Sequence, residues 1–418
     1  MARSNLITGL DIGSHSIRVV VGQLVDRGPR EQPHIIATVE VSSEGISRGV
    51  VKSLDDAVSS ISVALERAEK ITGAPISNVY LAIAGAQILS LESKGVVGIS
   101  RSDGEITEQD VERAIEASRT FATPSNYDIL HVIPRSFNVD GEANIKDPVG
   151  MQGIRLEVSA YIIQTLSSQM KNLTKCVYRA GVEIDDLVLG VLSAAEATLT
   201  SRAKVLGVVL LNIGASHTSF VIYEAGDLVY AGILPIGGEH ITSDIAIGLR
   251  TSFEVAEELK LRYGVASARD VSRKTEVNLR ELGSVDDEVI NLKSVAEIIE
   301  ARVEEIFVSV DQTLRKLGKS GRLPAGAVLV GGTANLPGLI DVAKHKLGLP
   351  ALTGFPLGIS SVSDKIADPA FATSLGLIKW GALSYTSSAS SFRSILNNVA
   401  GAGALFKQVK GFFNLFRK

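Results

Sequence analysis

Two short segments of this chain repeat one pattern of strand, tight turn and strand, and this repeat constrains the fold more than any other feature. Residues 10–16 read LDIGSHS and lead into the run IRVVVG, whereas residues 211–219 read LNIGASHTS and lead into FVIY. Each segment has an apolar strand, a turn that contains glycine and serine, and a second apolar strand. Asp11 and Asn212 hold the same place in the two copies, 201 positions apart in a chain of 418 residues. The repeat therefore predicts two similar half-domains.

The turns of these hairpins have the residues that a phosphate-binding loop needs. Glycine lets backbone N–H groups approach a phosphate closely, and hydroxyl groups add further donors. An acidic residue at the end of the first strand can hold Mg²⁺ or its water ligands, which makes Asp11 the candidate metal ligand. One such hairpin alone is better explained as a plain β-turn, but two in register favour a phosphate site. The candidate contacts are Asp11, Gly13, Ser14, His15, Gly214, Ala215, Ser216, His217 and Thr218.

A third segment, residues 327–339, reads AVLVGGTANLPGL and predicts a buried strand that ends in two glycines, with a helix beginning near Pro337. Alone it would be an ordinary strand-to-helix turn. Beside two phosphate hairpins, it is typical of the actin, Hsp70 and sugar kinase superfold, an α/β fold in which ATP lies between two lobes. The added candidate contacts are Gly331, Gly332, Thr333 and Asn335.

Length and composition agree with a protein of more than one domain. A chain of 418 residues exceeds one ordinary core, and 45% hydrophobic with 21% charged residues is the profile of a soluble globular protein. The net charge of −4 gives no indication of nucleic-acid binding. The single cysteine, Cys176, excludes a disulfide framework and fits a reducing cytoplasm. We expect neither a signal peptide nor a membrane-spanning helix, because no apolar run approaches about 18 residues.

Several longer stretches carry a more specific resemblance. Residues 131–157 begin with HVIP, contain IKDPVGM and end with GIRLE, and residues 237–251 read GGEHITSDIAIGLRT. Shorter matches are AEIIEARVEEI at residues 296–306 and DPAFAT at residues 368–373. Together these stretches resemble the bacterial cell-division family FtsA, whose members are actin-like, and the resemblance covers nearly the whole chain.

The resemblance implies an actin-like core in four subdomains, with a linker and an amphipathic helix at the C-terminal end. The implied boundaries are 1–83 with 164–196 and 362–384 (first inner subdomain), 84–163 (small inserted subdomain), 197–239 with 306–361 (second inner subdomain), 240–305 (helical cap), 385–403 (linker) and 404–418 (membrane-targeting helix). Within the cap, residues 244–249 and 253–259 have helical spacing of apolar positions, and Gly264 is a predicted helix stop. By the pattern of the superfold, Glu254, Glu257 and Lys260 face the adenosine; a solvated charged face is the alternative.

The chain departs from the family where charge would organise Mg²⁺ and an attacking water. Asn212 stands where an Asp is usual, Gly190 where a Glu is usual, and Ser219 near the place of a second Asp. Phosphoryl transfer to water depends on placing both groups. We therefore expect ATP or ADP to bind, with weak Mg²⁺ binding and slow or absent hydrolysis, and we assign no catalytic residue beyond Asp11. If His15 and His217 face the phosphates, their protonated imidazoles could offset the phosphate charge that weaker Mg²⁺ binding leaves uncompensated. The alternative is that the two histidines are neutral sequence drift in loops that are under less constraint.

The last fifteen residues, ALFKQVKGFFNLFRK, predict an amphipathic helix beyond a linker rich in small and polar residues. A core helix and a partner-binding helix are alternatives, but aromatic insertion with basic flanks favours a reversible anchor on an anionic membrane surface. The apolar face comprises Leu405, Phe406, Val409, Phe412, Phe413 and Phe416, and the basic residues are Lys407, Lys410, Arg417 and Lys418.

The function that the resemblance implies is a cytoplasmic adaptor on the inner face of the cytoplasmic membrane at the division septum. Its expected partner is the tubulin-like division protein FtsZ, bound by the cap at residues 240–305, and it is expected to self-associate into actin-like filaments. No FtsZ-contacting residue is assigned, because residues 265–293 depart from the family pattern. The alternatives are an actin-like pilus-assembly scaffold and a small-molecule kinase of the same superfold.

Overall fold

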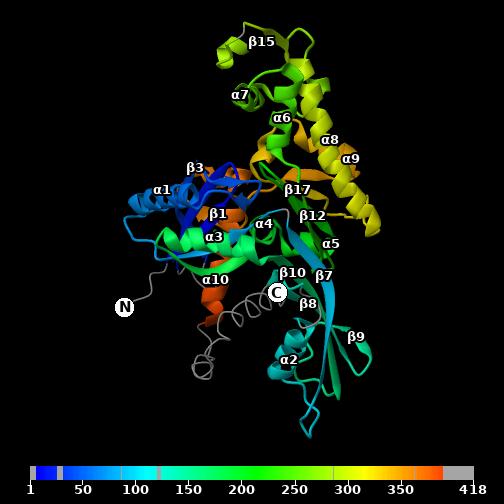
Figure 1. Cartoon of the computed structure of the whole chain (residues 1–418). Coiled ribbons are helices and arrows are strands. Elements are labelled where there is room, and N and C mark those ends of the chain that lie inside the picture. The colour runs from blue at the N-terminus through cyan, green and yellow to red at the C-terminus, as the bar shows by residue number, and fades with distance from the viewer. Residues whose placement is uncertain are drawn as a thin grey trace.

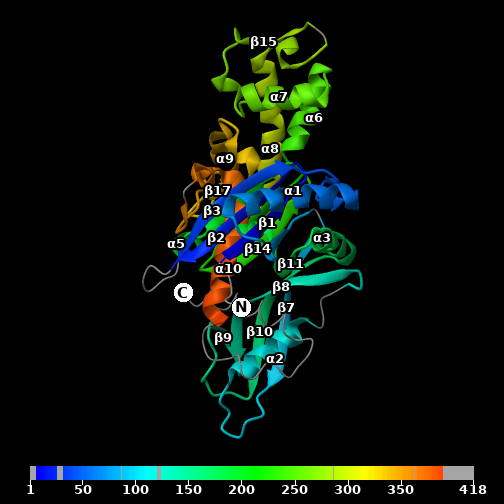
Figure 2. The ribbon, with the colours of Figure 1, turned by 90° about the vertical axis from the view of Figure 1, so that its left-hand side faces the viewer.

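The computed structural model describes residues 6–25, 32–85, 87–119, 124–285, 287–361 and 363–388. It is elongated, with two central lobes, a helical cap at one end and a small inserted sheet at the other (Figures 1 and 2). The predicted amphipathic helix at residues 404–418 lies outside the described residues. The last described helix, α10 (Ala372–Ser388), runs past residue 385, where the linker was predicted to begin.

The first lobe is built on a six-stranded sheet with the order β11-β6-β1-β2-β3-β19. Strands β1, β2 and β3 form an antiparallel meander, and β6 and β11 then add in parallel to β1. The bounds are β1 Leu6–Ile12, β2 Ser16–Val25, β3 Gln32–Ser42, β6 Asn78–Ile83, β11 Glu183–Leu189 and β19 Ser360–Ser361. A small hairpin of β4 (Ile46–Ser47) and β5 (Val50–Val51) precedes α1 (Leu54–Thr72).

The second lobe repeats this topology. Strands β12, β13 and β14 form an antiparallel meander, and β17 and β18 add in parallel to β12, giving the order β14-β13-β12-β17-β18. The bounds are β12 Val208–Ile213, β13 Thr218–Glu224, β14 Asp227–Leu234, β17 Ala327–Val330 and β18 Ala351–Thr353. The duplicated half-domain predicted from the two hairpins is thus present as a duplicated sheet.

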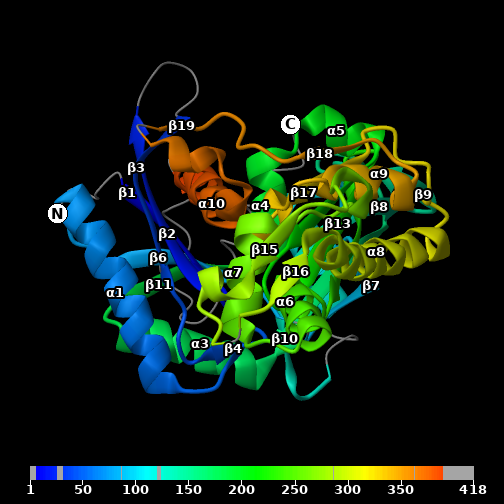
Figure 3. The same ribbon diagram turned by 90° about the horizontal axis from the view of Figure 1, so that it is seen from above.

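Helices cover both faces of the first sheet, with α1 on one side and α10 on the other (Figure 3). The α10 side is packed so closely that glycine is required at the contacts. A Cβ on Gly9 of β1 would lie 2.6 Å from the Ser374 carbonyl oxygen, and one on Gly376 would lie 1.8 Å from the Ser193 carbonyl oxygen of α4 (Gly190–Thr198). Helix α10 therefore lies directly against β1 and α4. The other helices of the lobes are α3 (Ser167–Arg179), α5 (Ser201–Leu206) and α9 (Leu339–Leu347).

The inserted sheet has the order β7-β10-β8-β9 and a core of its own. Helix α2 crosses β7 so closely that a Cβ on Gly95 would lie 1.9 Å from the Ala114 carbonyl oxygen. The bounds are β7 Ile88–Gly98, α2 Glu108–Arg119, β8 Tyr127–Val139, β9 Glu142–Ile145 and β10 Arg155–Leu166.

The inserted sheet is joined in the chain to the first lobe but also contacts the second. The Tyr161 hydroxyl of β10 donates to Ser90 Oγ of β7 (2.8 Å), and Ser90 donates to the carbonyl oxygen of Ala231 in β14 (2.8 Å). The Ala231 N–H closes the ring by donating to the Tyr161 hydroxyl (3.1 Å). Lys146 of the insert and Asp227 of β14 form a further ion pair. These contacts link the two lobes through the insert.

The cap consists of three helices and a small hairpin. Helix α6 packs against α8, and α8 continues down to α9 of the second lobe (Figure 1). The bounds are α6 Gly238–Leu249, α7 Phe253–Tyr263, β15 Glu276–Asn278, β16 Val289–Asn291 and α8 Leu292–Lys316. Gly264 ends α7, as the sequence predicts, because a Cβ there would lie 2.3 Å from the Lys260 carbonyl oxygen.

Candidate functional site

The two repeated hairpins close their turns with the same hydrogen bond. The Gly13 N–H donates to the Ser16 carbonyl oxygen (3.0 Å), and the Gly214 N–H donates to the His217 carbonyl oxygen (3.0 Å). A Cβ at Gly13 would lie 2.9 Å from the Ser16 carbonyl oxygen, so the first turn is too tight for a residue with a side chain at position 13. The equivalence of the hairpins therefore extends from sequence to backbone geometry.

The tips of the hairpins meet between the lobes. Ser14 Oγ lies 3.0 Å from Ser216 Oγ, and it also accepts the Gly49 N–H (2.8 Å). His217 Nδ1 lies 3.2 Å from Ser216 Oγ on the second hairpin. These hydroxyls thus come together from the two halves of the chain at the place where a shared phosphate would have to sit.

A cavity of about 370 Å³ lies between the lobes at these hairpins. This volume is within the range usual for small-molecule sites. The structure brings fourteen of the sixteen predicted contact residues to its wall. They are Asp11, Gly13, Ser14, His15, Gly214, Ala215, Ser216, His217, Glu257, Lys260, Gly331, Gly332, Thr333 and Asn335.

Two predicted contacts are wrong in position. The Thr218 side chain is buried and donates to the Ile236 carbonyl oxygen (2.8 Å), so it ties β13 to the segment that follows β14 and does not line the cavity. Glu254 is exposed in the first turn of α7, where its own backbone N–H and Ser252 lower its pKa. Glu257 and Lys260 line the cavity, whereas Glu254 lies one helical turn before Glu257 and does not line it.

The double glycine after β17 has a steric cause. Gly331 has φ +90°, and a Cβ there would lie 2.5 Å from both Asn212 Oδ1 and the Ile213 carbonyl oxygen. Thr333 Oγ1 then donates to the Gly214 carbonyl oxygen (3.2 Å). The segment after β17 can therefore lie flat against the second hairpin only because residue 331 has no side chain.

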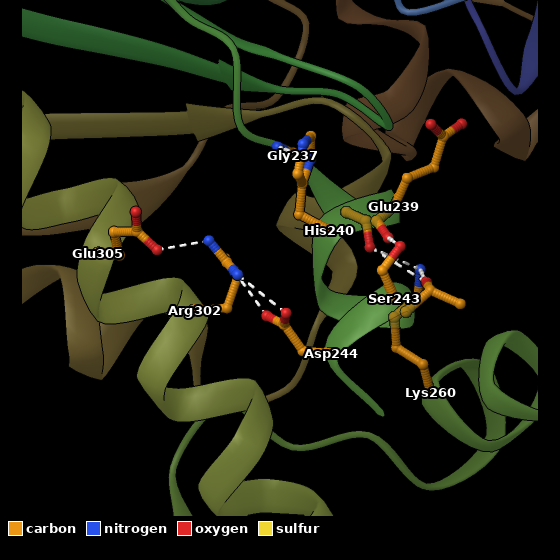
Figure 4. A network of polar contacts seen from close by, with 10 residues as sticks. Gly237, Glu239, His240, Ser243, Asp244, Lys260, Arg302 and Glu305 are labelled. Atoms are coloured by element: carbon orange, nitrogen blue, oxygen red, sulfur yellow. Dashed lines mark hydrogen bonds and ion pairs between the residues drawn. The ribbon is translucent and has the colours of Figure 1, made fainter. Parts of the chain in front are cut away.

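The start of α6 also lines the cavity, beside the two hairpins and the segment after β17. The Gly238 and Glu239 N–H groups donate to the carbonyl oxygens of Gly214 (2.9 Å) and Ala215 (2.8 Å), which fixes this helix to the second hairpin. Figure 4 shows the side chain of Lys260 reaching α6 from α7, whereas the Glu239 carboxylate points away from this network. Lys260 Nζ donates to Thr242 Oγ1 (2.8 Å) and Glu257 Oε2 (2.7 Å).

A second ion pair holds α6 to the long helix of the cap. Arg302 of α8 forms a bidentate pair with Asp244 of α6, at 2.6 and 2.8 Å, and also contacts Glu305 at 2.5 Å (Figure 4). Helix α6 therefore connects the cap with the cavity, because its first turn lines the cavity and its later turns pack in the cap.

The family model described as "Cell division protein FtsA" matches residues 209–376, and the model of the SHS2 domain inserted in FtsA matches residues 85–164. Curated FtsA proteins are similar along the length of the chain. That of Bacillus subtilis is 37% identical over 91% of this chain and 84% of its own length. That of Pseudomonas aeruginosa is 32% identical over 90% of this chain and 89% of its own length.

This chain belongs to the FtsA family of cell-division proteins.

Solved structures confirm the actin-like fold predicted for this FtsA chain. A protein of the PilM-PilN type IV pilus biogenesis complex aligns with a TM-score of 0.66 at 18% identity, over 90% of this chain and 98% of its own. MreB5 of Spiroplasma citri bound to ADP aligns with a TM-score of 0.55 at 12% identity, over 93% and 99%. At these identities the likeness concerns the fold alone.

The floor of the cavity in this FtsA chain contains a charged residue that the sequence motifs did not predict. Arg18 of β2 lines the cavity beside Asp11, as does Glu40 of β3. The sequence does mark this residue, because Arg18 interrupts the apolar run of residues 17–21. It lies two positions after Ser16, so both side chains are expected on the same face of the strand. Sequence alone does not tell which face of that strand would meet the second lobe.

Burial shifts two titratable groups at this floor. Desolvation raises the pKa of Asp11 to about 6, against a smaller opposing effect of Arg18. Burial lowers the pKa of His217 to about 4, so this imidazole is neutral near pH 7. The proposed offset of phosphate charge by protonated His217 is therefore not supported, and His15 is exposed at the cavity rim.

The residues present do not fit a Mg²⁺ site. Asp11 stands opposite the cation Arg18 in the register of β1 and β2, the Asn212 amide donates to Thr373 Oγ1 (3.0 Å), and Gly190 has no side chain. Within the described part of the chain no three His, Cys, Asp or Glu side chains group as metal ligands. Beside a nucleotide, Mg²⁺ is usually held by one or two carboxylates together with the phosphates and water. Of the positions expected to organise the ion, Asp11 alone keeps a carboxylate, and it lies next to a guanidinium.

Proposed function

We propose that this FtsA-family protein is a nucleotide-binding scaffold of cell division, anchored by its C-terminal segment to the inner face of the cytoplasmic membrane at the septum. The observation that carries the nucleotide part is the cavity between two equivalent glycine-serine hairpins, one from each lobe. Backbone amides and serine hydroxyls are the groups that hold phosphates in such loops.

ATP or ADP is the proposed ligand, with the phosphates at the hairpins and the base toward Glu257, Lys260 and the segment after β17. Hydrolysis is proposed to be slow or absent, because no acidic side chain stands at positions 190, 212 or 219. The test is phosphate release from ATP by the purified full chain. Release well above a protein-free blank, abolished by Asp11→Ala, would contradict slow hydrolysis without contradicting binding.

The membrane part of the proposal depends on the predicted helix at residues 404–418. None of the helices in the described ranges has the length and apolarity to span a bilayer. A surface-lying helix is held by its apolar face and by basic residues, each of which contributes about 1 kcal/mol near an anionic surface.

Vesicle co-sedimentation tests this anchor with a matched pair of variants. Phe413→Asp places a carboxylate on the proposed apolar face and should release the protein from anionic vesicles. Asn414→Asp adds the same charge on the opposite face and should leave most of the protein bound. Equal binding of the two variants would contradict the amphipathic anchor.

FtsZ is the proposed partner at the cap, residues 240–305. The cap offers exposed apolar side chains for such a contact, among them Ile247 on α6 (77% exposed) and Val289 on β16 (58% exposed). The test is recruitment of purified FtsZ to anionic vesicles by the full chain, with Phe413→Asp as the control that should abolish it. Self-association into actin-like filaments is tested on the same vesicles by electron microscopy.

A pilus-assembly scaffold is the alternative that one observation favours, the TM-score of 0.66 with the PilM-PilN complex. The resemblance to FtsA proteins at 30–37% identity favours division instead. Pull-downs from a cytoplasmic extract, with and without liposomes, distinguish the two by whether FtsZ or pilus components are recovered. A small-molecule kinase is the weaker alternative, and substrate-dependent ADP production would indicate it.

A further inference from the structure

Three charged residues lie side by side on neighbouring strands at the floor of the cavity. Asp11 of β1 is the register partner of Arg18 of β2, and Arg18 is the register partner of Glu40 of β3. All three side chains line the cavity. Arg18 therefore stands between two carboxylates, directly below the first phosphate hairpin.

The guanidinium of Arg18 is held in place but is not saturated with hydrogen bonds. One terminal nitrogen donates to Glu40 Oε1 (2.6 Å), and Cζ lies 5.6 Å from the centroid of the Phe371 ring. The side chain is only 15% exposed, and Nε is buried with no hydrogen-bond partner within the described ranges. The same terminal nitrogen lies 4.0 Å from where a Cβ on Gly332 would be, so the side chain reaches the double glycine of the second lobe.

The charges of the cavity leave Arg18 as the cation for the phosphate end. Arg18 and Lys260 are the two Lys or Arg side chains among the described residues that line it. Both are ion-paired, Lys260 with Glu257 at 2.7 Å and Arg18 with Glu40 at 2.6 Å, but Lys260 lies on the side formed by α6 and α7, whereas Arg18 lies directly below the first hairpin. A nucleoside di- or triphosphate has several negative charges, and these cannot be desolvated without a compensating cation.

We propose that the guanidinium of Arg18 binds the terminal phosphates of the nucleotide and takes the role of a divalent cation, so that nucleotide binding in this protein does not require Mg²⁺. This inference depends on the proposed nucleotide binding. Arginine suits the role because its planar fork binds phosphate oxygens in pairs and keeps its charge at any physiological pH. It also explains how the acidic positions 190 and 212 could be lost without loss of the ligand.

The test measures the affinity of the full chain for ADP and for adenosine by calorimetry, once in Mg²⁺ and once in EDTA. We expect ADP affinity to differ by less than about threefold between the buffers, because the neutralising cation belongs to the protein. Arg18→Gln should weaken ADP binding about 10- to 100-fold in both buffers, the loss typical of a hydrogen bond to a charged group. It should leave adenosine affinity unchanged.

Two further variants keep the test decisive if Arg18→Gln folds poorly. Arg18→Lys keeps the charge and should retain part of the ADP affinity. Glu40→Gln removes the carboxylate that competes for the guanidinium and should strengthen ADP binding, whereas loss of a merely structural ion pair would not. Thermal unfolding of each variant identifies losses that are due to misfolding.

The outcomes separate this inference from the proposal on which it depends. If the wild-type chain binds no adenine nucleotide in either buffer, the proposed nucleotide function fails. If it binds ADP but loses more than about tenfold affinity in EDTA, a metal does the neutralising and Arg18 does not. If Arg18→Gln and Glu40→Gln both bind ADP like the wild type, Arg18 has no part in phosphate binding.

Discussion

His131 connects the inserted sheet to the wall of the cavity through one buried side chain. Its Nε2 accepts the backbone N–H of Leu189 at 2.9 Å, and its ring centre lies 5.7 Å from that of Trp380 on α10. Leu189 is followed by Gly190, and both line the cavity. Burial lowers the pKa of His131 to about 3, because a charged imidazole would lose its hydration there.

This histidine should make stability depend on pH. The unfolded chain takes up a proton on His131 below about pH 6.5, whereas the folded chain does so only near pH 3, so stability falls as pH falls through this window. The expected loss by pH 5 is about 2 kcal/mol. His131→Gln cannot be protonated and should lose less stability between pH 7.5 and pH 5, as measured by urea unfolding.

Two other groups contribute in the same range, and the comparison with wild type removes them. His217 acts in the same direction between pH 6.5 and about 4. Asp11 acts in the opposite direction between pH 3.8 and about 6, because its raised pKa means that the folded chain holds the proton more tightly. An identical pH dependence in wild type and His131→Gln would show that His131 is not buried as a neutral group.

The residue types of the site could be predicted from the sequence, but their neighbours could not. Glycine and serine in two equivalent turns indicated a phosphate loop, and these residues do line the cavity. Arg18 was missed because its role depends on three strands and on the approach of the second lobe. Thr218 was included wrongly because, in the strand that begins there, alternate residues point away from the cavity.

At the scale of elements, two helices of the cap were predicted from periodicity, whereas the packing of the helices was not predicted. Apolar spacing correctly indicated α6 and α7, and Gly264 correctly marked the end of α7. Nothing in the sequence of α10 shows that it lies directly on α4. That contact is visible only in the structure, where Gly376 faces the backbone of Ser193.

Gly376→Ala should therefore be strongly destabilising. In an exposed helix this change would stabilise by about 1 kcal/mol. Here the new methyl group would lie 1.8 Å from a backbone oxygen, so we expect α10 to shift and the free energy of unfolding to fall by about 3 kcal/mol or more.

Gly98→Ala in β7 is the matched control, since a Cβ there meets no atom within 4 Å. It should be neutral or slightly stabilising in the same urea unfolding experiment. A stable Gly376→Ala variant would contradict direct contact between the backbones of α10 and α4 at this position.

At the scale of the whole molecule, the repeated hairpins predicted two similar half-domains, and the structure shows two lobes with the same sheet topology. The contact of the inserted sheet with the second lobe could not be predicted in this way. It depends on the Tyr161 hydroxyl, the Ser90 hydroxyl and one backbone N–H of β14, which are far apart in the chain and have no motif in common.

Tyr161→Phe tests how much this contact contributes. The variant keeps the ring but leaves the Ala231 N–H without its acceptor, which should cost about 1–3 kcal/mol of stability. Hydrogen exchange at the Ala231 amide should become faster. Tyr178→Phe, which removes a hydroxyl from a half-exposed ring on α3, should change neither measurement. Unaltered exchange at Ala231 in Tyr161→Phe would mean that the insert does not dock on β14.

The same ring of hydrogen bonds bears on how long a bound nucleotide would stay. If a nucleotide bound between the lobes leaves when the lobes part, the insert must first separate from β14. None of Tyr161, Ser90 and Ala231 lines the cavity. The residence time of the nucleotide would then depend on these three hydrogen bonds, which lie outside its binding site. A protein that binds the inserted sheet and pulls it from β14 would speed up nucleotide exchange without contacting the ligand.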